Sequence, residues 1–496
     1  MSDSPLSGKR IAVLFLALIC IWLIPVWSVD FPPLVDYPNH LARMSILSDG
    51  GADPHLREYY DIRWAVLPNL AMDVAVPFMA RFISVPAAGK AFITLIFLLL
   101  AGGAMALHRV LFGQWTPWPL IAFLFLYNRP FLWGFMNFLF GLGVALWILA
   151  AWIASCRRSR PFRMGVFVPL TLLLFFCHLF ALGVYGLAIL GVTFYRRRRD
   201  APSFPGWKEW ATALAPFVLP AILFLFVSPT GGEEAVTQLR FGGLTRKLTA
   251  IFQPVNNYNR VLDAGTALLL AASLLAGLAT RKLQIAPPLR YPIIILSFFF
   301  LLMPEVLLGV HSVDNRLPNA LAFLLAAGTR FRGNRRNETR ILAILLVLGL
   351  FRLGFVGWHW RTADQIYHRH HSFLGKMEPG ARLFSAIFLG GDWQPFPVPV
   401  SHFPCQMIAD RSAFVPSLFA YPSQQPVQIA TEYQEIGKKF PETRFNHKWN
   451  PDWDFIRKHF DYVWIVNKDA PALPEVPKNF IPINSGSDFR LFRVAN

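Results

Sequence analysis

Charged residues are scarce in this chain. Only 15% of its 496 residues are Asp, Glu, Lys or Arg, whereas 54% are hydrophobic, and the mean hydropathy is +0.42. Soluble globular proteins carry about 25% charged residues. This composition therefore excludes an ordinary soluble protein and indicates a polytopic membrane protein.

Cysteine is also rare, with four in the chain. Cys20 and Cys177 lie in apolar runs, Cys156 follows one, and Cys405 stands alone in the polar C-terminal part. This distribution excludes a disulfide framework and a cysteine-based metal site. The residues at 27–30 contain no small-x-small cleavage pattern, so we expect the first apolar run to be a retained helix.

Long apolar runs are what the chain has in abundance, and a helix of about 20 such residues crosses a bilayer core. Clusters of Lys and Arg, which favour the cytoplasmic side, separate the runs. They lie at 9–10, 157–160, 196–199, 281–282 and 330–340. This pattern predicts about eleven crossings, with the N-terminus cytoplasmic and the C-terminus outside. The predicted crossings are 11–29, 90–108, a hairpin at 118–154, a hairpin at 164–195, 210–228, 263–280, 291–309, 317–329 and 341–357.

The net charge of +18 requires no nucleic acid, because much of it falls in these cytoplasmic turns. There it sets the orientation of the chain and meets anionic lipid headgroups. Apolar helices divide the basic residues instead of leaving them on one face. We therefore expect membrane lipid as a partner and no nucleic acid.

The chain divides into a helical membrane domain at 1–357 and a soluble domain at 358–496. Within the first domain, 30–89 is too polar to be buried in lipid and is predicted to be a large outer loop. Strand-like runs at 381–384, 462–466 and 489–494, with a helix near 452–460, predict a small α/β fold for the second domain.

Two helices are predicted in the outer loop. Asp36 is placed to be the N-cap of the first, with Pro38 in its first turn and its end near Ser48. The second carries an apolar stripe at i+4 spacing, typical of a helix that lies in the membrane interface. The stripe consists of Leu70, Val74, Phe78 and Phe82.

Two segments of this loop resemble motifs of the GT-C fold glycosyltransferases that use polyprenyl-phosphate sugars. The first is Val35-Asp36-Tyr37-Pro38-Asn39-His40, just outside the first helix. The second is Leu67-Pro68-Asn69-Leu70-Ala71-Met72-Asp73, followed by Ala80-Arg81-Phe82. The family includes protein O-mannosyltransferases and lipid A aminoarabinose transferases, and the resemblance extends over about residues 10–330. The chain departs from the family pattern at Tyr37, where many members have a second acid, and it lacks the Lys and one Pro of the second motif.

The resemblance implies transfer of a sugar from a polyprenyl-phosphate donor to a glycan, lipid or protein acceptor. It also implies a bacterial inner membrane location, with the C-terminal domain in the periplasm. The layout agrees with a transferase better than with a transporter or flippase for a lipid-linked saccharide, because no internal repeat is present. A non-catalytic scaffold is the third alternative.

Such a transfer needs a carboxylate that deprotonates or orients the acceptor. Asp36 is the candidate, as a base or as a metal ligand, and a plain helix N-cap is the alternative. His40, one turn further, could share a proton or a divalent ion (Mg or Mn) with it. Asp73 is a candidate for the second carboxylate, ahead of Glu58 and Asp61.

The donor phosphate needs cations. Arg316 is the leading candidate because it lies at the outer end of a predicted helix, where the positive-inside rule disfavours it. Pairing with Asp314 is the alternative. Further phosphate-binding candidates in outer loops are Arg240, Arg246, Lys247 and Arg260, and candidates for lining the cavity are Glu305 and His178.

Overall fold

A computed structural model describes residues 8–199, 206–231, 239–307, 310–389, 400–440, 444–445, 451–468, 475–486 and 489–495. The chain forms two compact units. The first, here the helical unit, comprises Met1–Trp27, Val66–Ala71 and Ala91–Gly357. The second, here the α/β unit, comprises Ser28–Ala65, Met72–Lys90 and Trp358–Asn496. The boundary at 357/358 coincides with the predicted one, whereas most of the outer loop belongs to the α/β unit and was predicted as part of the first domain.

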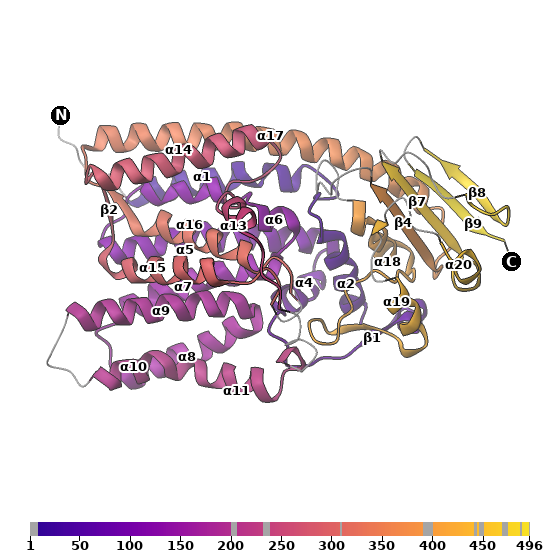
Figure 1. Ribbon diagram of the computed structural model, residues 1–496, viewed down its shortest axis with the longest axis horizontal. Helices are drawn as coiled ribbons and strands as arrows, with labels where there is room; N and C mark the ends of the chain where they lie inside the picture. The colour runs from indigo at the N-terminus through magenta and orange to yellow at the C-terminus, as the bar shows by residue number, and fades with distance from the viewer. Residues whose placement is uncertain are drawn as a thin grey trace. The chain divides into compact units, whose positions relative to one another are not determined.

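Eight helices in the described part of the chain are long and apolar enough to cross a membrane (Figure 1). A helix of about 20 residues spans about 30 Å, which matches the hydrocarbon core of a bilayer. The eight are Gly8–Trp27 (α1), Val85–Phe112 (α5), Met136–Ala154 (α7), Arg160–Cys177 (α8), Leu179–Arg199 (α9), Gly206–Phe226 (α10, η2 and α11), Arg260–Ala279 (α14) and Arg335–Leu374 (α17).

Three of the about eleven predicted crossings fall on segments shorter than these eight helices. Residues Trp118–Phe125 form a 3-10 helix (η1) followed by Arg129–Trp133 (α6). Prolines at 117, 119 and 130 explain why this arm of the predicted hairpin does not form one long helix. The other two are Pro287–Leu302 (α15) and Leu317–Gly328 (α16), which at 1.5 Å per residue span about 24 and 18 Å.

Close helix contacts form the core of the helical unit. Gly191 of α9 lies directly against α15, since a Cβ there would be 2.3 Å from Pro292 N. Gly143 of α7 meets α5 in the same way, 2.6 Å from Leu99 Cβ. Small residues at helix crossings allow backbones to approach closely, which strengthens packing in a lipid environment.

The helical unit also contains shorter elements. They are Ala215–Phe217 (η2), Pro229–Gly231 (η3), Leu244–Ala250 (α13), Asp314–Arg316 (η4) and an antiparallel pair of strands, Leu283–Ile285 (β2) and Thr329–Phe331 (β3). Of these, α13 and η4 carry several of the predicted phosphate-binding residues.

A five-stranded sheet forms the core of the C-terminal part of the α/β unit. Its order is β6-β4-β7-β9-β8, with β4 parallel to both neighbours and the pairs β7–β9 and β9–β8 antiparallel. The strands are Leu383–Leu389 (β4), Arg444–Phe445 (β6), Tyr462–Lys468 (β7), Phe480–Ser485 (β8) and Phe489–Val494 (β9). Strands β4 and β7 are buried on both faces, as expected for parallel strands. The strands predicted at 462–466 and 489–494 are confirmed, as is the helix near 452–460, observed as Trp453–His459 (α20).

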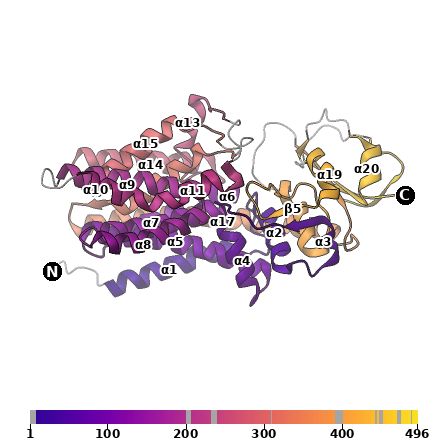
Figure 2. The same ribbon diagram turned by 90° about the horizontal axis from the view of Figure 1, so that it is seen from below.

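The N-terminal part of the same unit is helical. Its elements are Tyr37–Asp49 (α2), Pro54–Tyr59 (α3), Tyr60–Ile62 (β1) and Ala71–Ala80 (α4). Strand β1 pairs with Val427–Ile429 (β5), and Figure 2 shows β5 beside α2 and α3. Helix α2 packs on Val400–Cys405 (η5) and Gln406–Arg411 (α18), and the unit is completed by Thr431–Tyr433 (η6) and Gln434–Lys439 (α19).

Candidate functional site

Asp36 is the N-cap residue of α2, as predicted. Its backbone is in the right-handed helical region, and its side chain makes no capping hydrogen bond. The carboxylate lies next to His402 on η5, with 3.5 Å between Oδ1 and Nε2. The two side chains are 17% and 12% exposed. The carboxylate is thus partly accessible and is not used to cap the helix.

Asn39 connects this end of α2 to the segment after α18. It is fully buried, its Oδ1 accepts a hydrogen bond from Phe419 N (2.8 Å), and its Nδ2 donates to Ser417 O (2.9 Å). The same Nδ2 lies 3.5 Å from His402 Nδ1. The ring of Phe419 packs on His402, with 4.8 Å between centroids, and reaches His40 at 6.2 Å.

The predicted metal site consists of Asp36 and His40. The backbone N–H of His40 donates to Asp36 O (3.0 Å), which is an ordinary helical hydrogen bond. Among the described residues, no group of three or more His, Cys, Asp or Glu side chains is arranged to hold a metal ion. Mg²⁺ and Mn²⁺ prefer several oxygen ligands, and here the Asp36 carboxylate has the imidazole of His402 as a neighbour. The described residues do not fit such an ion, and metal dependence stays a prediction.

Asp73, the predicted second carboxylate, lies on α4 in a buried ion pair. Arg43 Nε donates to Asp73 Oδ1 (2.6 Å) and its Nη2 to Oδ2 (3.2 Å), and both side chains are 0% exposed. The weaker candidates make surface contacts. Glu58 accepts from the Tyr433 hydroxyl (2.5 Å), and Asp61 pairs with Arg63 (2.6 Å).

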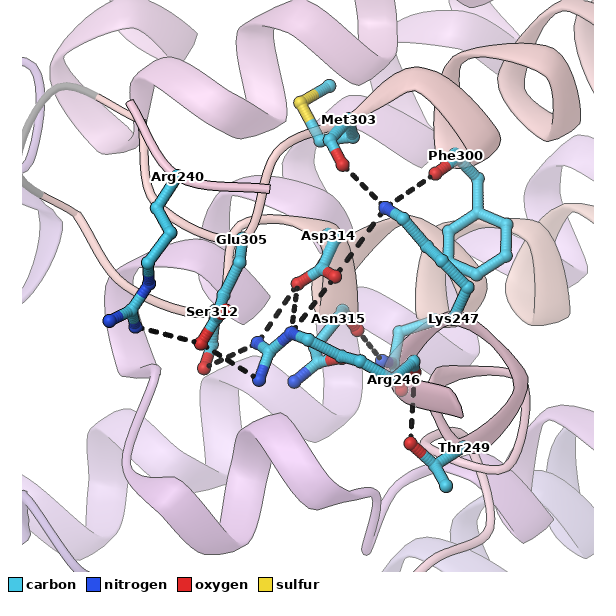
Figure 3. A network of polar contacts seen from close by, with 11 residues as sticks. Arg240, Arg246, Lys247, Thr249, Phe300, Met303, Glu305, Ser312, Asp314 and Asn315 are labelled. Carbon is cyan, nitrogen blue, oxygen red and sulfur yellow. Dashed lines mark hydrogen bonds and ion pairs between the residues drawn. The ribbon is translucent and has the colours of Figure 1, made fainter. Parts of the chain in front are cut away.

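In the helical unit, three of the predicted phosphate-binding residues share one polar network (Figure 3). Arg246 bridges two carboxylates, lying 3.0 Å from Asp314 and 3.2 Å from Glu305. Lys247 contacts Asp314 at 3.5 Å and donates to the carbonyls of Phe300 (2.9 Å) and Met303 (2.5 Å), and Arg240 contacts Glu305 at 3.0 Å. Asp314 thus pairs with Arg246 and Lys247, and the alternative that it pairs with Arg316 is wrong. Three cations face two carboxylates, which leaves net positive charge.

Arg316 and His178, singled out for different roles, lie together. Arg316 is 6% exposed, and its Nη1 is 3.4 Å from His178 Nε2. Its guanidinium lies 4.7 Å from the ring centroid of Phe135, and the rings of Phe138 and Phe180 follow at 5.7 and 5.8 Å. A cation over aromatic faces is held in a fixed orientation.

The second motif borders the same turn, between α8 and α9, that carries His178. Leu70 N donates to Phe176 O (2.7 Å), and Leu179 N donates to Pro68 O (3.0 Å). Asn137 of α7 donates to Asn69 O (2.7 Å). The remaining candidate, Arg260, is the first residue of α14 and is exposed.

No family model matches this sequence, and no curated protein sequence matches it. Among solved structures, a crystal structure of ArnT from Cupriavidus metallidurans bound to undecaprenyl phosphate is similar. The TM-score is 0.52 at 14% sequence identity, and the match covers 98% of both chains. ArnT is a lipid A aminoarabinose transferase with the GT-C fold.

This chain has the GT-C fold. The predicted fold class, a polytopic helical protein with sheets in its C-terminal region, is confirmed. Within this GT-C fold, sequence reasoning missed His402 and the role of Asn39. His402 lies in the short 3-10 helix η5, where neither periodicity nor spacing in the sequence indicates a functional residue. It is 363 positions from Asn39 in the chain.

Proposed function

We propose that this protein transfers a sugar from a polyprenyl-phosphate donor to an acceptor hydroxyl or amine, with Asp36 as the general base. The single observation that carries the proposal is the Asp36 carboxylate. It begins α2, makes no helix-capping bond and is partly exposed. The GT-C fold supports it, as does the undecaprenyl phosphate bound to ArnT.

The reaction balances with one base. As the acceptor oxygen or nitrogen forms its bond to the anomeric carbon, its proton passes to Asp36, while the bond from that carbon to the phosphate oxygen breaks. The products are the glycosylated acceptor and the polyprenyl phosphate. A positioned base of this kind contributes about 10²- to 10⁴-fold to the rate.

The departing phosphate gains negative charge, and preorganised cations stabilise it. Arg316 is our first candidate, because its guanidinium is held by aromatic rings and offers the planar geometry that suits a phosphate. Arg246, Lys247 and Arg240 add positive charge through the network of Figure 3. Arg260 is the weakest candidate because it is solvent-exposed.

The resemblance to the GT-C family supports a place in the bacterial inner membrane, and the basic clusters between the long helices support a cytoplasmic N-terminus with the α/β unit in the periplasm. Alkaline phosphatase fused after residue 496 should then be active, and the same enzyme fused after residue 199 should be inactive. The reverse pattern would contradict this orientation.

Transfer of labelled sugar from proteoliposomes loaded with polyprenyl-phosphate sugars tests the function. Wild type should release label to an acceptor fraction of lipids, glycans or proteins, and Asp36→Asn should lower the rate at least about 100-fold. Asp61→Asn is the matched control, because Asp61 is a partly exposed carboxylate of the same unit that pairs with Arg63. Movement of donor lipid across the bilayer without any transfer would instead identify a flippase.

A further inference from the structure

We propose that His402 is a positioning residue for the Asp36 carboxylate, and that Asn39 holds it in the tautomer this requires. The inference rests on the proposed function and adds a member to its catalytic group. It concerns contacts within the α/β unit: Asp36 and Asn39 begin α2, and His402 lies on η5.

The orientation of the Asn39 amide is fixed by its two backbone partners. Phe419 N is a donor and lies 2.8 Å from Oδ1, so that atom must be the carbonyl oxygen. Ser417 O is an acceptor and lies 2.9 Å from Nδ2, so that atom must be the amide nitrogen. Exchanging the two atoms would set the amide nitrogen against Phe419 N, a second donor, and the amide oxygen against Ser417 O, a second acceptor. Both contacts would be unfavourable because Asn39 is fully buried.

The fixed amide determines the state of the imidazole. Asn39 Nδ2 can only donate, and beyond Ser417 O it faces both His402 Nδ1 and Cys405 Sγ at 3.5 Å, so a proton on Nδ1 would oppose an N–H and the unprotonated Nδ1 is favoured. In the neutral ring the proton then lies on Nε2. That N–H faces Asp36 Oδ1 at 3.5 Å, which is long for a hydrogen bond. Catalytic hydrogen bonds are often long without substrate and shorten in the reactive complex.

The ring has little freedom to leave this arrangement. Phe419 covers one side, with 4.8 Å between ring centroids and an interplanar angle of 65°. Ser401 and Phe403, the neighbours of His402 on η5, are buried, and the His402 side chain is 12% exposed. The same Asn39 that sets the tautomer also holds the backbone of Phe419.

This arrangement assigns separate roles to the two carboxylate oxygens of Asp36. Oδ1 faces the Nε2–H of His402, which fixes the rotamer of the carboxylate. In this proposal Oδ2 takes the proton of the acceptor. His402 itself neither gains nor loses a proton. The η5 segment of the C-terminal region thereby completes a site that begins in the first outer loop.

Three substitutions of His402 separate positioning from packing. In His402→Gln the side-chain amide nitrogen can replace Nε2–H, whereas His402→Phe keeps an aromatic ring on Phe419 without a donor, and His402→Ala removes both. We expect Phe and Ala to lower kcat about 10- to 100-fold, the range for partners that orient a reacting group. The KM for the donor should be unchanged, and Gln should stay within about threefold of wild type.

Asn39→Asp gives a second test. A carboxylate facing Nδ1 draws the ring proton to that atom, so the lone pair of Nε2 then faces Asp36. We expect kcat to fall with Asn39→Asp as it does with His402→Phe, measured alongside the thermal midpoint of each variant. Combining Asn39→Asp with His402→Gln should recover part of kcat, because the glutamine amide does not depend on a ring tautomer.

The outcomes are distinct. Wild type without transfer activity would overturn the proposed function and this inference with it. An active wild type with an inactive Asp36→Asn and an unaffected His402→Phe would overturn the inference alone. Equal losses of kcat in His402→Gln and His402→Phe, at wild-type thermal midpoints, would also overturn it, because only the donor distinguishes the two.

Discussion

Arg43 on α2 binds both carboxylate oxygens of Asp73 on α4, and neither side chain is exposed. Sequence reasoning placed Asp73 beside Asp36 as a possible second catalytic carboxylate. A buried, doubly hydrogen-bonded pair has instead the geometry of an internal link between two helices. We propose that it fixes α4 against α2, and that only Asp36 acts on the acceptor.

Breaking this pair should cost stability. Asp73→Asn leaves Arg43 buried without a counter-charge, and removal of one partner of a buried ion pair costs about 3–5 kcal/mol. Replacing both residues, by Arg43→Met with Asp73→Leu, should restore much of the loss. Thermal unfolding of the purified protein measures this. An Asp73→Asn protein of wild-type stability with no transfer activity would reassign Asp73 to catalysis.

Arg316 and Arg240 should differ in their effect on the donor. Loss of a hydrogen bond to a charged group costs about 1.5–3 kcal/mol, so Arg316→Ala should raise the donor KM about 10- to 100-fold. Arg240 is 62% exposed and pairs with Glu305, and a surface pair contributes at most about 1 kcal/mol. Arg240→Ala should therefore raise the donor KM at most about fivefold. Equal donor KM values in the two variants would exclude Arg316 from the phosphate site.

Helix α4 should lie in the membrane interface through its exposed apolar stripe. Val74 and Phe78 on α4 are 58% and 57% exposed, and Phe82 just after the helix is 77% exposed, whereas Asp73 and Val76 on α4 are buried. A spin label at Phe78→Cys should be relaxed by oxygen dissolved in lipid more than by a water-soluble nickel complex. The background is Cys20→Ser with Cys156→Ser. A label at Arg57→Cys, on α3, is the control and should show the opposite preference.

Acid should weaken the α/β unit through Asp461. Burial raises the pKa of this carboxyl, but hydrogen bonds from Arg382 lower it more, so the net pKa is below the usual value. A depressed folded-state pKa contributes stability that is present above the unfolded-state pKa, near 4. That stability is lost as the pH falls through the folded-state value. The thermal midpoint should therefore fall less steeply below pH 4 in Asp461→Asn than in wild type. Parallel curves would contradict this assignment.

Local patterns in the sequence predicted much of the fold. Strand β9 has its predicted bounds, and α2 begins after Asp36 as expected, because alternation and capping depend on near neighbours. Of the stripe predicted from i+4 spacing, Val74, Phe78 and Phe82 are exposed, whereas Leu70, which lies before α4, is buried. The first arm of the hairpin predicted at 118–154 instead forms two short helices, η1 and α6, because hydropathy alone does not show that prolines divide an apolar run.

The contacts of the candidate site were less predictable. Asp314 lies two positions before Arg316 in the sequence, yet it pairs with Arg246 and Lys247, which reach it from α13. His402 meets Asp36 across more than 360 positions, in a segment without periodicity. Such pairs depend on tertiary packing, which one sequence without relatives does not reveal.

The most direct test of the account measures donor binding and single-turnover transfer in the same samples of wild type and Asp36→Asn. A general base acts in the reaction and not in donor binding. We therefore predict an unchanged Kd for the polyprenyl-phosphate sugar and a single-turnover rate at least about 100-fold lower in Asp36→Asn. Equal single-turnover rates in the two proteins would contradict the central claim.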